Sequence, residues 1–371
     1  MIGGKVQPAN TAAQSKPASD PPGRKNLPRA GLLQQPAKVE TVKTIGLDIS
    51  KNVFQLHGVD VDGQVVLKRQ LRRAEVVRFF AGLPSCLVGI EACAGAHAWA
   101  RELIEQGHDV RLMPPSYVKP YVRRQKTDAA DAAAICEAVT RPSMRFVPVK
   151  SEAHQAVLLQ HRTRDLLVRQ LTQTVNAIRA HLAEFGVVAP VGVQNVDRLL
   201  ETAAHSVPDH AMEAIDLLAR QFTETRARVD EITRRIEQAQ KADATARRLT
   251  SIPGVGAITA SAITATTPDV TQFRTARDYA AWMGLTPRQH SSGGRERIGG
   301  ISKMGDRYLR RLLYLGALAR IRIRRQRGEG DDWIWRLLER KPAKVAAIAI
   351  ANKMARIIWA LLKTGQSYRA T

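Results

Sequence analysis

Four carboxylates occupy positions where an α/β domain brings side chains together. Asp48 ends an apolar run, GLDIS, and Glu91 ends another, GIEA. Asp128 and Asp131 are three residues apart in TDAADA, so a helix there places both on one face. Carboxylates at the ends of adjacent strands point into one crevice, to which a helix packed across that end can add two more. The spacing therefore predicts a four-carboxylate site.

Such a site favours a divalent cation. Carboxylates held close together repel one another unless a cation lies between them. Hard oxygen ligands suit Mg²⁺ or Mn²⁺, and two such ions can hold the attacking and leaving oxygens of a phosphodiester. Each carboxylate taken alone fits a turn or a helix cap equally well. The ordered set of four carries the prediction.

The chain is strongly basic. Lysine and arginine number 57 against 34 acidic residues, which gives a net charge of +23. This excess predicts a polyanionic partner, nucleic acid ahead of an anionic membrane surface. Next to the second pair of carboxylates, the segment KPYVRRQK supplies candidate phosphate ligands: Lys119, Arg123, Arg124 and Lys126.

A second chemical candidate is the segment RQHSSGGRERIGG, residues 288–300. A serine hydroxyl can form a covalent bond with phosphorus once a base or a metal ion activates the reaction. Two glycines would let the backbone approach DNA closely, and Arg288, Arg295 and Arg297 would bind phosphates. By residue type alone, a basic turn without catalytic function fits as well.

The elements that must position the carboxylates can be read from the pattern. Residues 41–150 give three strands in an antiparallel meander, with an Asp-Gly turn in VDGQ, and then alternating helices and strands. This is the order of the RNase H-like fold, a mixed sheet with helices on both faces. The overall prediction is a multidomain protein, with this α/β domain followed by helical parts.

The rest of the chain divides by composition. Residues 1–40 are poor in aromatic and β-branched residues and predict a disordered basic arm. Residues 151–245 predict two long helices, which form either an antiparallel hairpin or a coiled coil between subunits. Residues 246–330 predict a mostly helical domain, and residues 331–371 a helical tail.

Residues 246–330 contain further candidate phosphate ligands. IPGVGAIT is similar to the hairpin of a helix-hairpin-helix, in which the backbone at Gly254 and Gly256 would bind a phosphate; a tight turn between helices is the alternative. A basic stretch then follows on a helix, and some of its members would belong only to a solvated face: Lys303, Arg307, Arg310 and Arg311.

Cysteine and hydropathy patterns indicate the compartment. Cys86, Cys93 and Cys136 form no C-x-x-C pair and are expected to be buried, reduced thiols, and no zinc site is expected. The apolar segment VAAIAIANKMARIIWALL carries Lys353 and Arg356 in its middle, which argues against a membrane span. We expect a bacterial, cytoplasmic protein associated with the nucleoid.

Five segments together carry a family resemblance: GLDISKN, GIEACAGAHAWA, RRQKTDAADA, IPGVGAITA and GLTPRQHSSGGRERIGGISKMGDRYLRRLL. In this order, and across about residues 41–327, they resemble the DEDD transposases of the insertion-sequence-110 family, relatives of the Piv and MooV invertases. The resemblance implies a RuvC-like domain that binds Mg²⁺ through Asp48, Glu91, Asp128 and Asp131. It also implies a nucleophilic serine, best matched by Ser292, with Ser291 as the rival and Ser302 a distant third.

The same resemblance implies a reaction and partners. DNA strands would be cut and rejoined through a 5′-phosphoserine link, and a bridge RNA would pair with donor and target DNA. The protein would act as a homo-oligomer, a dimer or a tetramer, with active sites that can be shared between subunits. Two other functions stay open: an RNase H-like nuclease or junction resolvase that uses water, and a non-catalytic nucleic-acid-binding scaffold with structural carboxylates.

Overall fold

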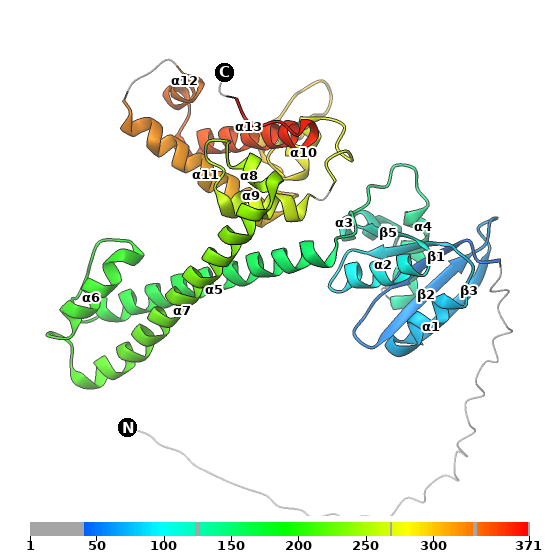
Figure 1. Cartoon of the computed structure of the whole chain (residues 1–371), viewed down its shortest axis with the longest axis horizontal. Helices are drawn as coiled ribbons and strands as arrows, with labels where there is room; N and C mark the ends of the chain where they lie inside the picture. Colours follow the sequence, from blue (N-terminus) through cyan, green and yellow to red (C-terminus); the bar gives the residue numbers. More distant parts are fainter. Residues whose placement is uncertain (1–40, 123–126, 268, 329–331, 370–371) are drawn as a thin grey trace, which may run out of the picture.

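The computed structural model describes residues 41–122, 127–267, 269–328 and 332–369. Figure 1 shows three successive parts: a sheet with helices on both faces, an arm of two long helices, and a helical C-terminal part. The predicted disordered arm, residues 1–40, lies outside the described residues.

The first part is built on a five-stranded sheet in the order β3-β2-β1-β4-β5. β1, β2 and β3 form an antiparallel meander, whereas β4 pairs in parallel with both β1 and β5. The mixed sheet confirms the predicted α/β class, and the order is the one expected for an RNase H-like sheet. The elements are β1 (Thr44–Asp48), β2 (Val53–Val59), β3 (Val65–Arg72), α1 (Val76–Ala81), β4 (Leu87–Glu91), α2 (Ala96–Glu105), β5 (Asp109–Met113), α3 (Pro115–Val118) and α4 (Asp128–Val139).

Alternation of side chains along the strands separates the two faces of the sheet. Phe54 and Leu56 on β2 are buried in a core that includes residues of α1 and α2. The predicted turn between β2 and β3 is present: Asp60 Oδ1 accepts hydrogen bonds from the backbone N–H groups of Asp62 and Gln64, and Gly63 has a φ of 76°. The alternating pattern of this segment therefore sets both the strand pairing and the buried face.

α4 packs on the opposite face through two glycines. A Cβ on Gly46 of β1 would lie 2.1 Å from the carbonyl oxygen of Ala132, and one on Gly89 of β4 would lie 2.8 Å from Val139. Helix α4 begins after Thr127, whose side chain accepts a hydrogen bond from the backbone N–H of Ala130. Close contact at these glycines fixes the position of α4 relative to the end of β1.

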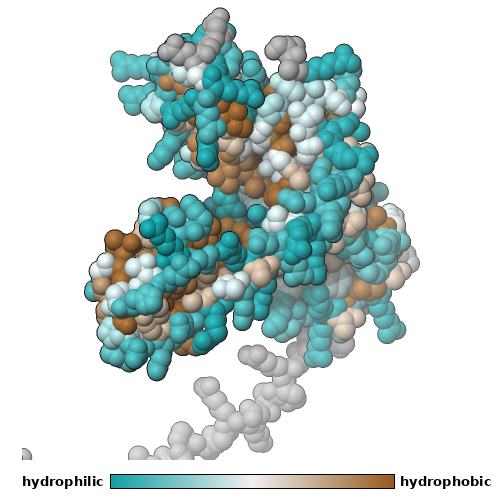
Figure 2. Space-filling view, turned by 60° about the vertical axis from the view of Figure 1, so that its left-hand side comes forward, coloured by the Kyte–Doolittle hydropathy of each residue, from teal (hydrophilic) through white to brown (hydrophobic). Residues whose placement is uncertain are grey.

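The arm consists of α5 (Glu152–Ala183) and α7 (Asp209–Ala242), joined through α6 (Val196–Ala203). The two long helices pack on each other within one chain as an antiparallel hairpin, one of the two predicted arrangements. Val175, Ile178 and Leu182 on α5 are buried, whereas Phe185, just beyond the end of the helix, is 42% exposed. In Figure 2, hydrophobic surface gathers at the far end of the arm, where exposed residues include Val188, Val191 and Leu217.

The C-terminal part is helical apart from one hairpin. Its helices are α8 (Ala244–Leu249), α9 (Ala257–Thr266), α10 (Ala276–Trp282), α11 (Arg307–Gln326), α12 (Trp333–Arg340) and α13 (Ala343–Thr364). By length and composition α13 could cross a membrane. However, eight of its residues are buried in the core of this part, and the Lys353 ammonium lies 4.4 Å from the centre of the Trp333 ring. Here α13 is the central core helix, as its two internal charges indicated.

Helix α5 is attached to both flanking parts. At its N-terminal end, Arg101 of α2 donates a hydrogen bond to the carbonyl oxygen of Lys150, at 2.8 Å. Farther along, the ring nitrogens of buried His161 lie 3.1 Å from the Tyr308 hydroxyl on α11 and 3.1 Å from the Ser261 hydroxyl on α9. Burial lowers the pKa of His161 to about 4, with a further contribution from Arg164, so the ring is neutral at pH 7.

One expectation about the cysteines was wrong. Cys86 and Cys136 are buried free thiols, as predicted, but Cys93 is exposed. Cys93 follows the end of β4, where the chain leaves the sheet before α2 begins.

Candidate active site

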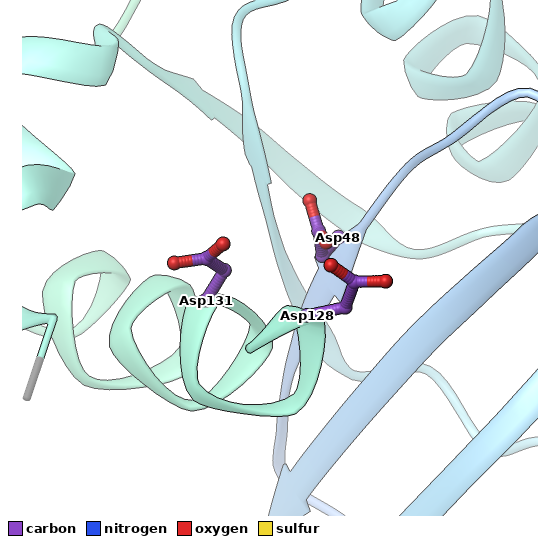
Figure 3. Close-up of side chains that lie close together, drawn as sticks. All are labelled: Asp48, Asp128 and Asp131. Carbon is purple, nitrogen blue, oxygen red and sulfur yellow. The ribbon is translucent and has the colours of Figure 1, made fainter. Parts of the chain in front are cut away.

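Three of the four predicted carboxylates come together. One oxygen from each of Asp48, Asp128 and Asp131 lies within 4.8 Å of the others. Asp48 is the last residue of β1, and the other two occupy the first turn of α4. Figure 3 shows Asp48 reaching from the end of the strand toward the same side of α4 on which both helix carboxylates stand. The predicted strand-plus-helix arrangement is therefore present for these three.

Glu91 lies at the same edge of the sheet but outside that group of three. It ends β4, which pairs in parallel with β1, so the two strand-end carboxylates belong to neighbouring strands. The pKa of the Cys93 thiol is raised, first by burial and then by the negative charges of Glu91 and Asp48. The parallel pairing of Leu47 with Ile90 places Glu91 at the same sheet edge as Asp48.

The three clustered residues fit a divalent cation. Asp48 and Asp131 are half-buried and Asp128 is exposed, so a bound ion would keep open positions toward solvent. Carboxylate oxygens from two separate elements are the donor set that Mg²⁺ and Mn²⁺ prefer. The grouping has the chemistry of a metal site on a phosphodiester-processing enzyme.

The predicted basic neighbours are only partly visible. Lys119 is exposed, in the short turn that follows α3. Arg123, Arg124 and Lys126 lie outside the described residues. Their predicted contact with phosphate stays a prediction.

The serine segment is a β-hairpin. Strands β6 (Pro287–Gln289) and β7 (Ile298–Ile301) pair in antiparallel fashion. At the tip, the backbone N–H of Arg295 donates to the carbonyl oxygen of Ser292 at 3.1 Å, and Gly293 and Gly294 have φ values of 57° and 76°. Two positive φ values in a two-residue connection define a type I′ turn, which glycine adopts without strain. Ser292 is the first residue of that turn.

The rival serines have different surroundings. The Ser291 hydroxyl accepts a hydrogen bond from the backbone N–H of Arg297 at 3.4 Å, across the hairpin. Ser302 lies beyond the hairpin, and its carbonyl oxygen accepts two hydrogen bonds from the Arg288 guanidinium. Residues 287–300 are all exposed, so Ser292 and the side chains of Arg295 and Arg297 are accessible to a large substrate.

The glycines of IPGVGAIT have two different roles. Gly254 has a φ of 89°, and its carbonyl oxygen would lie 2.0 Å from a Cβ on Gly316 of α11, so the turn packs tightly against that helix. Gly256 precedes α9 and has open space around it. A phosphate could therefore reach the backbone at Gly256, whereas Gly254 serves a helix–helix contact.

The predicted basic stretch also divides. Arg310 donates hydrogen bonds to the carbonyl oxygens of Met283 and Gly305, at 3.1 Å each. Arg311 pairs with Asp165 of α5 and lies over the Tyr308 ring. Lys303 and Arg307 are exposed. Arg310 therefore makes contacts within the C-terminal part and Arg311 joins this part to the arm, whereas Lys303 and Arg307 are accessible to a polyanion.

The hairpin and the carboxylates belong to different parts of the chain. Figure 1 shows the yellow segment that contains the hairpin beside α10 and α13, in the C-terminal part, whereas the sheet and α4, which carry the carboxylates, lie at the N-terminal end of α5. The contacts that hold the hairpin are with Thr286, Gly284 and other residues of its own domain. Within one described chain, the two halves of the predicted active site are separate.

Sequence reasoning missed one polar surface beside the carboxylates. The side chains of Gln55 and His57 on β2 and of Lys68 and Gln70 on β3 border an open groove next to the start of α4. The alternation in NVFQLHGV already placed Gln55 and His57 on the face opposite Phe54 and Leu56. That signal could have identified the surface.

Two family models match this chain. Residues 45–186 match a model of the DEDD type of IS110 elements, described as Transposase. Residues 246–330 match a model described as Transposase IS116/IS110/IS902 family. The first match spans the carboxylates and the second spans the serine hairpin.

Curated relatives align along almost their whole length. The chain is 50% identical to a probable family 20 transposase of Pseudomonas aeruginosa over 331 residues, which cover 88% of this chain and 98% of the relative. It is 39% identical to the transposase for insertion sequence element IS1328 of Yersinia enterocolitica, over 87% of this chain and 98% of the relative. It is 37% identical to the transposase for insertion sequence element IS1111A of Coxiella burnetii, over 89% and 92%.

Proposed function

The chain belongs to the IS110 family of insertion-sequence transposases, enzymes that cleave and join DNA strands, and we propose that it does so through a covalent bond between Ser292 and DNA. The observation that carries this proposal is the grouping of Asp48, Asp128 and Asp131 within 4.8 Å, in a chain whose second matched segment presents an accessible serine. Glu91, on the neighbouring strand, completes the proposed tetrad.

The three clustered carboxylates, with Glu91, would hold Mg²⁺ or Mn²⁺. When bound, the cation would neutralise negative charge that develops on the phosphate oxygens. The residues of the chain do the rest. The first turn of α4 and the end of β1 hold the carboxylates at fixed positions, and the exposed arginines of the hairpin, Arg295 and Arg297, bind the phosphates that flank the reacting one.

The covalent step balances without an added reactant. The Ser292 Oγ forms a bond to phosphorus while the bond from phosphorus to the 3′ oxygen breaks. The serine loses a proton and the departing 3′ oxygen gains one, which leaves a 3′-hydroxyl and a 5′-phosphoserine link. Since one phosphoester replaces another, the linkage keeps the free energy needed for rejoining to a different 3′-hydroxyl.

Gel analysis under denaturing conditions tests the covalent step. The full-length protein would be incubated with Mg²⁺, any required RNA, and DNA that carries the element ends with a labelled phosphate at the cut. Wild-type protein and the Ser291→Ala variant are expected to retain the label covalently, and the Ser292→Ala variant to bind DNA without forming the adduct. An adduct lost only in Ser291→Ala would move the nucleophile by one residue. Cleavage without any adduct would favour a hydrolytic nuclease, and absence of cleavage the binding scaffold.

The partners in this proposal are donor and target DNA and a guide RNA. The net charge of +23 and the exposed residues Lys303 and Arg307 favour contacts with the backbone of nucleic acids, which carry little sequence information. Pairing with an RNA would supply the missing selection of sequence, as in other RNA-guided systems. Purification with and without ribonuclease treatment, followed by the cleavage assay, tests this: activity should be lost with the RNA and return when the noncoding flank of the element is transcribed and added.

The proposed active form is an oligomer. The serine hairpin and the carboxylates lie on different parts of one chain (Figure 1), so a second copy can bring its hairpin to the carboxylates of the first. A protein with this composition and reaction would act on the bacterial nucleoid in the cytoplasm.

A further inference from the structure

A groove of about 640 Å³ opens beside the carboxylate cluster. One wall consists of side chains on β2 and β3, among them Gln55, His57 and Lys68. The other wall is the first turns of α4, where Ala129, Ala130 and Ala133 present only methyl groups. The alanines alternate along the helix with Asp128 and Asp131, so the groove and the cluster share one helix end.

Strand register shows that the groove lies on the same sheet face as the cluster. Asp48 of β1 is directly opposite Gln55 of β2, which is opposite Gln70 of β3. Directly opposite residues of antiparallel strands project from the same face. These three side chains therefore form a row that runs from the carboxylate cluster across the sheet.

A second row runs beside the first. Gly46 is opposite His57, and His57 is opposite Lys68. Gly46 faces α4, because a Cβ there would meet the Ala132 carbonyl oxygen. His57 and Lys68 therefore also project on the α4 side, and since β3 is the edge strand, the groove leads about 10 Å from the end of β1 to the edge of the sheet.

The chemistry of the groove suits a phosphodiester backbone. Lys68 supplies an ammonium group, and Gln55, His57 and Gln70 supply neutral hydrogen-bonding groups. The pKa of His57 is lowered by burial and by the nearby Lys68, so its imidazole is uncharged at pH 7. Among the described residues that line the groove, none is acidic. The cluster is thus negative, while the path that leads away from it is neutral to positive.

We propose that this groove binds the DNA strand that is cut, and holds its backbone on one side of the reacting phosphate. This inference rests on one part of the proposed function, namely that DNA is cut at the carboxylate cluster. A DNA strand is favoured over the guide RNA because the first row begins at Asp48 itself. The alanine wall lets the sugar-phosphate chain lie close to α4, and the side chains of the opposite wall contact it without requiring a particular base.

The test is DNA binding by full-length protein without divalent cation, so that no cutting occurs. Lys68→Gln removes one charge from the groove. Arg69→Gln, the matched control, removes one charge from the next residue. Arg69 also borders the groove, but its guanidinium lies over the Phe79 ring, on the face of α1. We expect Lys68→Gln to weaken binding about fivefold to tenfold and to lower the salt dependence by about one counterion, with Arg69→Gln changing affinity less than about twofold. Equal effects would mean that only overall charge matters, and would overturn the proposal.

Crosslinking locates the strand independently of affinity. A photoreactive p-benzoylphenylalanine in place of Gln70 should crosslink to DNA, and the same group in place of Arg69 should not. Crosslinks from position 70 to RNA instead would assign the groove to the guide, and crosslinks from neither position would reject it. Gln70→Glu, which introduces a negative charge at an exposed site, should weaken binding as Lys68→Gln does. The covalent-adduct assay tests the two proposals separately. If wild-type protein forms the adduct but Lys68→Gln binds DNA as tightly as wild type, only the groove proposal is rejected. If Lys68→Gln weakens DNA binding but wild-type protein forms no adduct, only the phosphoserine proposal is rejected.

Discussion

The carboxylate cluster and the serine hairpin differ in how the chain holds them. The cluster stands on β1 and α4, which meet so closely at Gly46 that no Cβ fits between them. The hairpin is exposed from Pro287 to Gly300, and its shape comes from a turn at two glycines and from pairing of β6 with β7. One half of the proposed active site is held by a buried contact between β1 and α4, and the other half projects from its domain.

This difference indicates which half must be preorganised. Carboxylates that share a cation need fixed mutual distances, because repulsion would otherwise separate them. A nucleophile that has to reach DNA, and then carry the attached strand, needs access more than rigidity. The predictions that follow test this division, beginning with the largest effect.

The first concerns a carboxylate of the cluster. Asp128→Asn should lower strand cleavage more than about a thousandfold, because it removes a charged ligand from the cation site. Single-turnover cleavage with saturating protein measures this. The control is Glu137→Gln on the same helix, which breaks only the exposed pair with Arg141 and should leave the rate within about twofold. Full activity of Asp128→Asn would exclude the proposed metal site.

The second prediction concerns the separation of the two halves. Asp128→Asn and Ser292→Ala variants, each inactive alone, should recover covalent adduct formation when mixed if one chain supplies carboxylates to the serine of another. A tagged Ser292→Ala chain allows the adduct to be assigned by size to its untagged partner. If only wild-type chains give an adduct and every mixture stays inactive, each chain uses its own serine.

The third compares a glycine from each half. Gly46→Ala should destabilise the sheet domain by about 3 kcal/mol, because the new methyl group would overlap the backbone of α4. Gly300→Ala on β7 should change stability by less than about 0.5 kcal/mol, since nothing lies within 4 Å of its added Cβ. Calorimetric unfolding of both variants gives the comparison, and similar losses would contradict the proposed difference between buried and projecting halves.

The fourth prediction is a pH dependence at the junction of the arm. The pKa of His161 is about 4 in the folded chain, against an ordinary value of 6.5 for an exposed histidine, so unfolding takes up a proton between these values. Its contribution to stability is therefore complete above about pH 6.5 and falls by up to about 1.4 kcal/mol per pH unit toward pH 4. Urea unfolding between pH 4.5 and 7 (about the window set by the two values) should show a shallower pH slope for His161→Gln than for wild type. An unchanged slope would show that other groups dominate.

Much of the sheet domain could be predicted because its information is local. The alternation of QLHGV, the Asp-Gly turn and the D-x-x-D spacing each depend on neighbours in sequence, and all three agree with the structure. The internal contacts made by Arg310 and Gly254 could not be predicted in this way. Their partners, Met283 and Gly316, are distant in sequence, so only the tertiary packing shows that both serve internal contacts.

The site was predicted in outline for the same reason. Residue types and spacing placed Asp48 with the helix carboxylates, but gave no distance from Glu91 to the others. The serine segment could be described only as a turn, because a hairpin of exposed residues has no buried face to give it an apolar pattern. Its strand pairing becomes visible only in the structure.

Helix α5 fixes the distance between the sheet domain and the C-terminal domain. It runs without interruption for 32 residues, about 48 Å at the usual rise, and is bonded to the sheet domain near one end and to α9 and α11 through His161. His161 is the tenth residue of the helix, so a short, stiff segment of α5 joins the two domains, and they cannot fold onto each other without breaking helical hydrogen bonds. The continuous helix therefore fixes the separation of the carboxylate cluster from the serine hairpin within one chain.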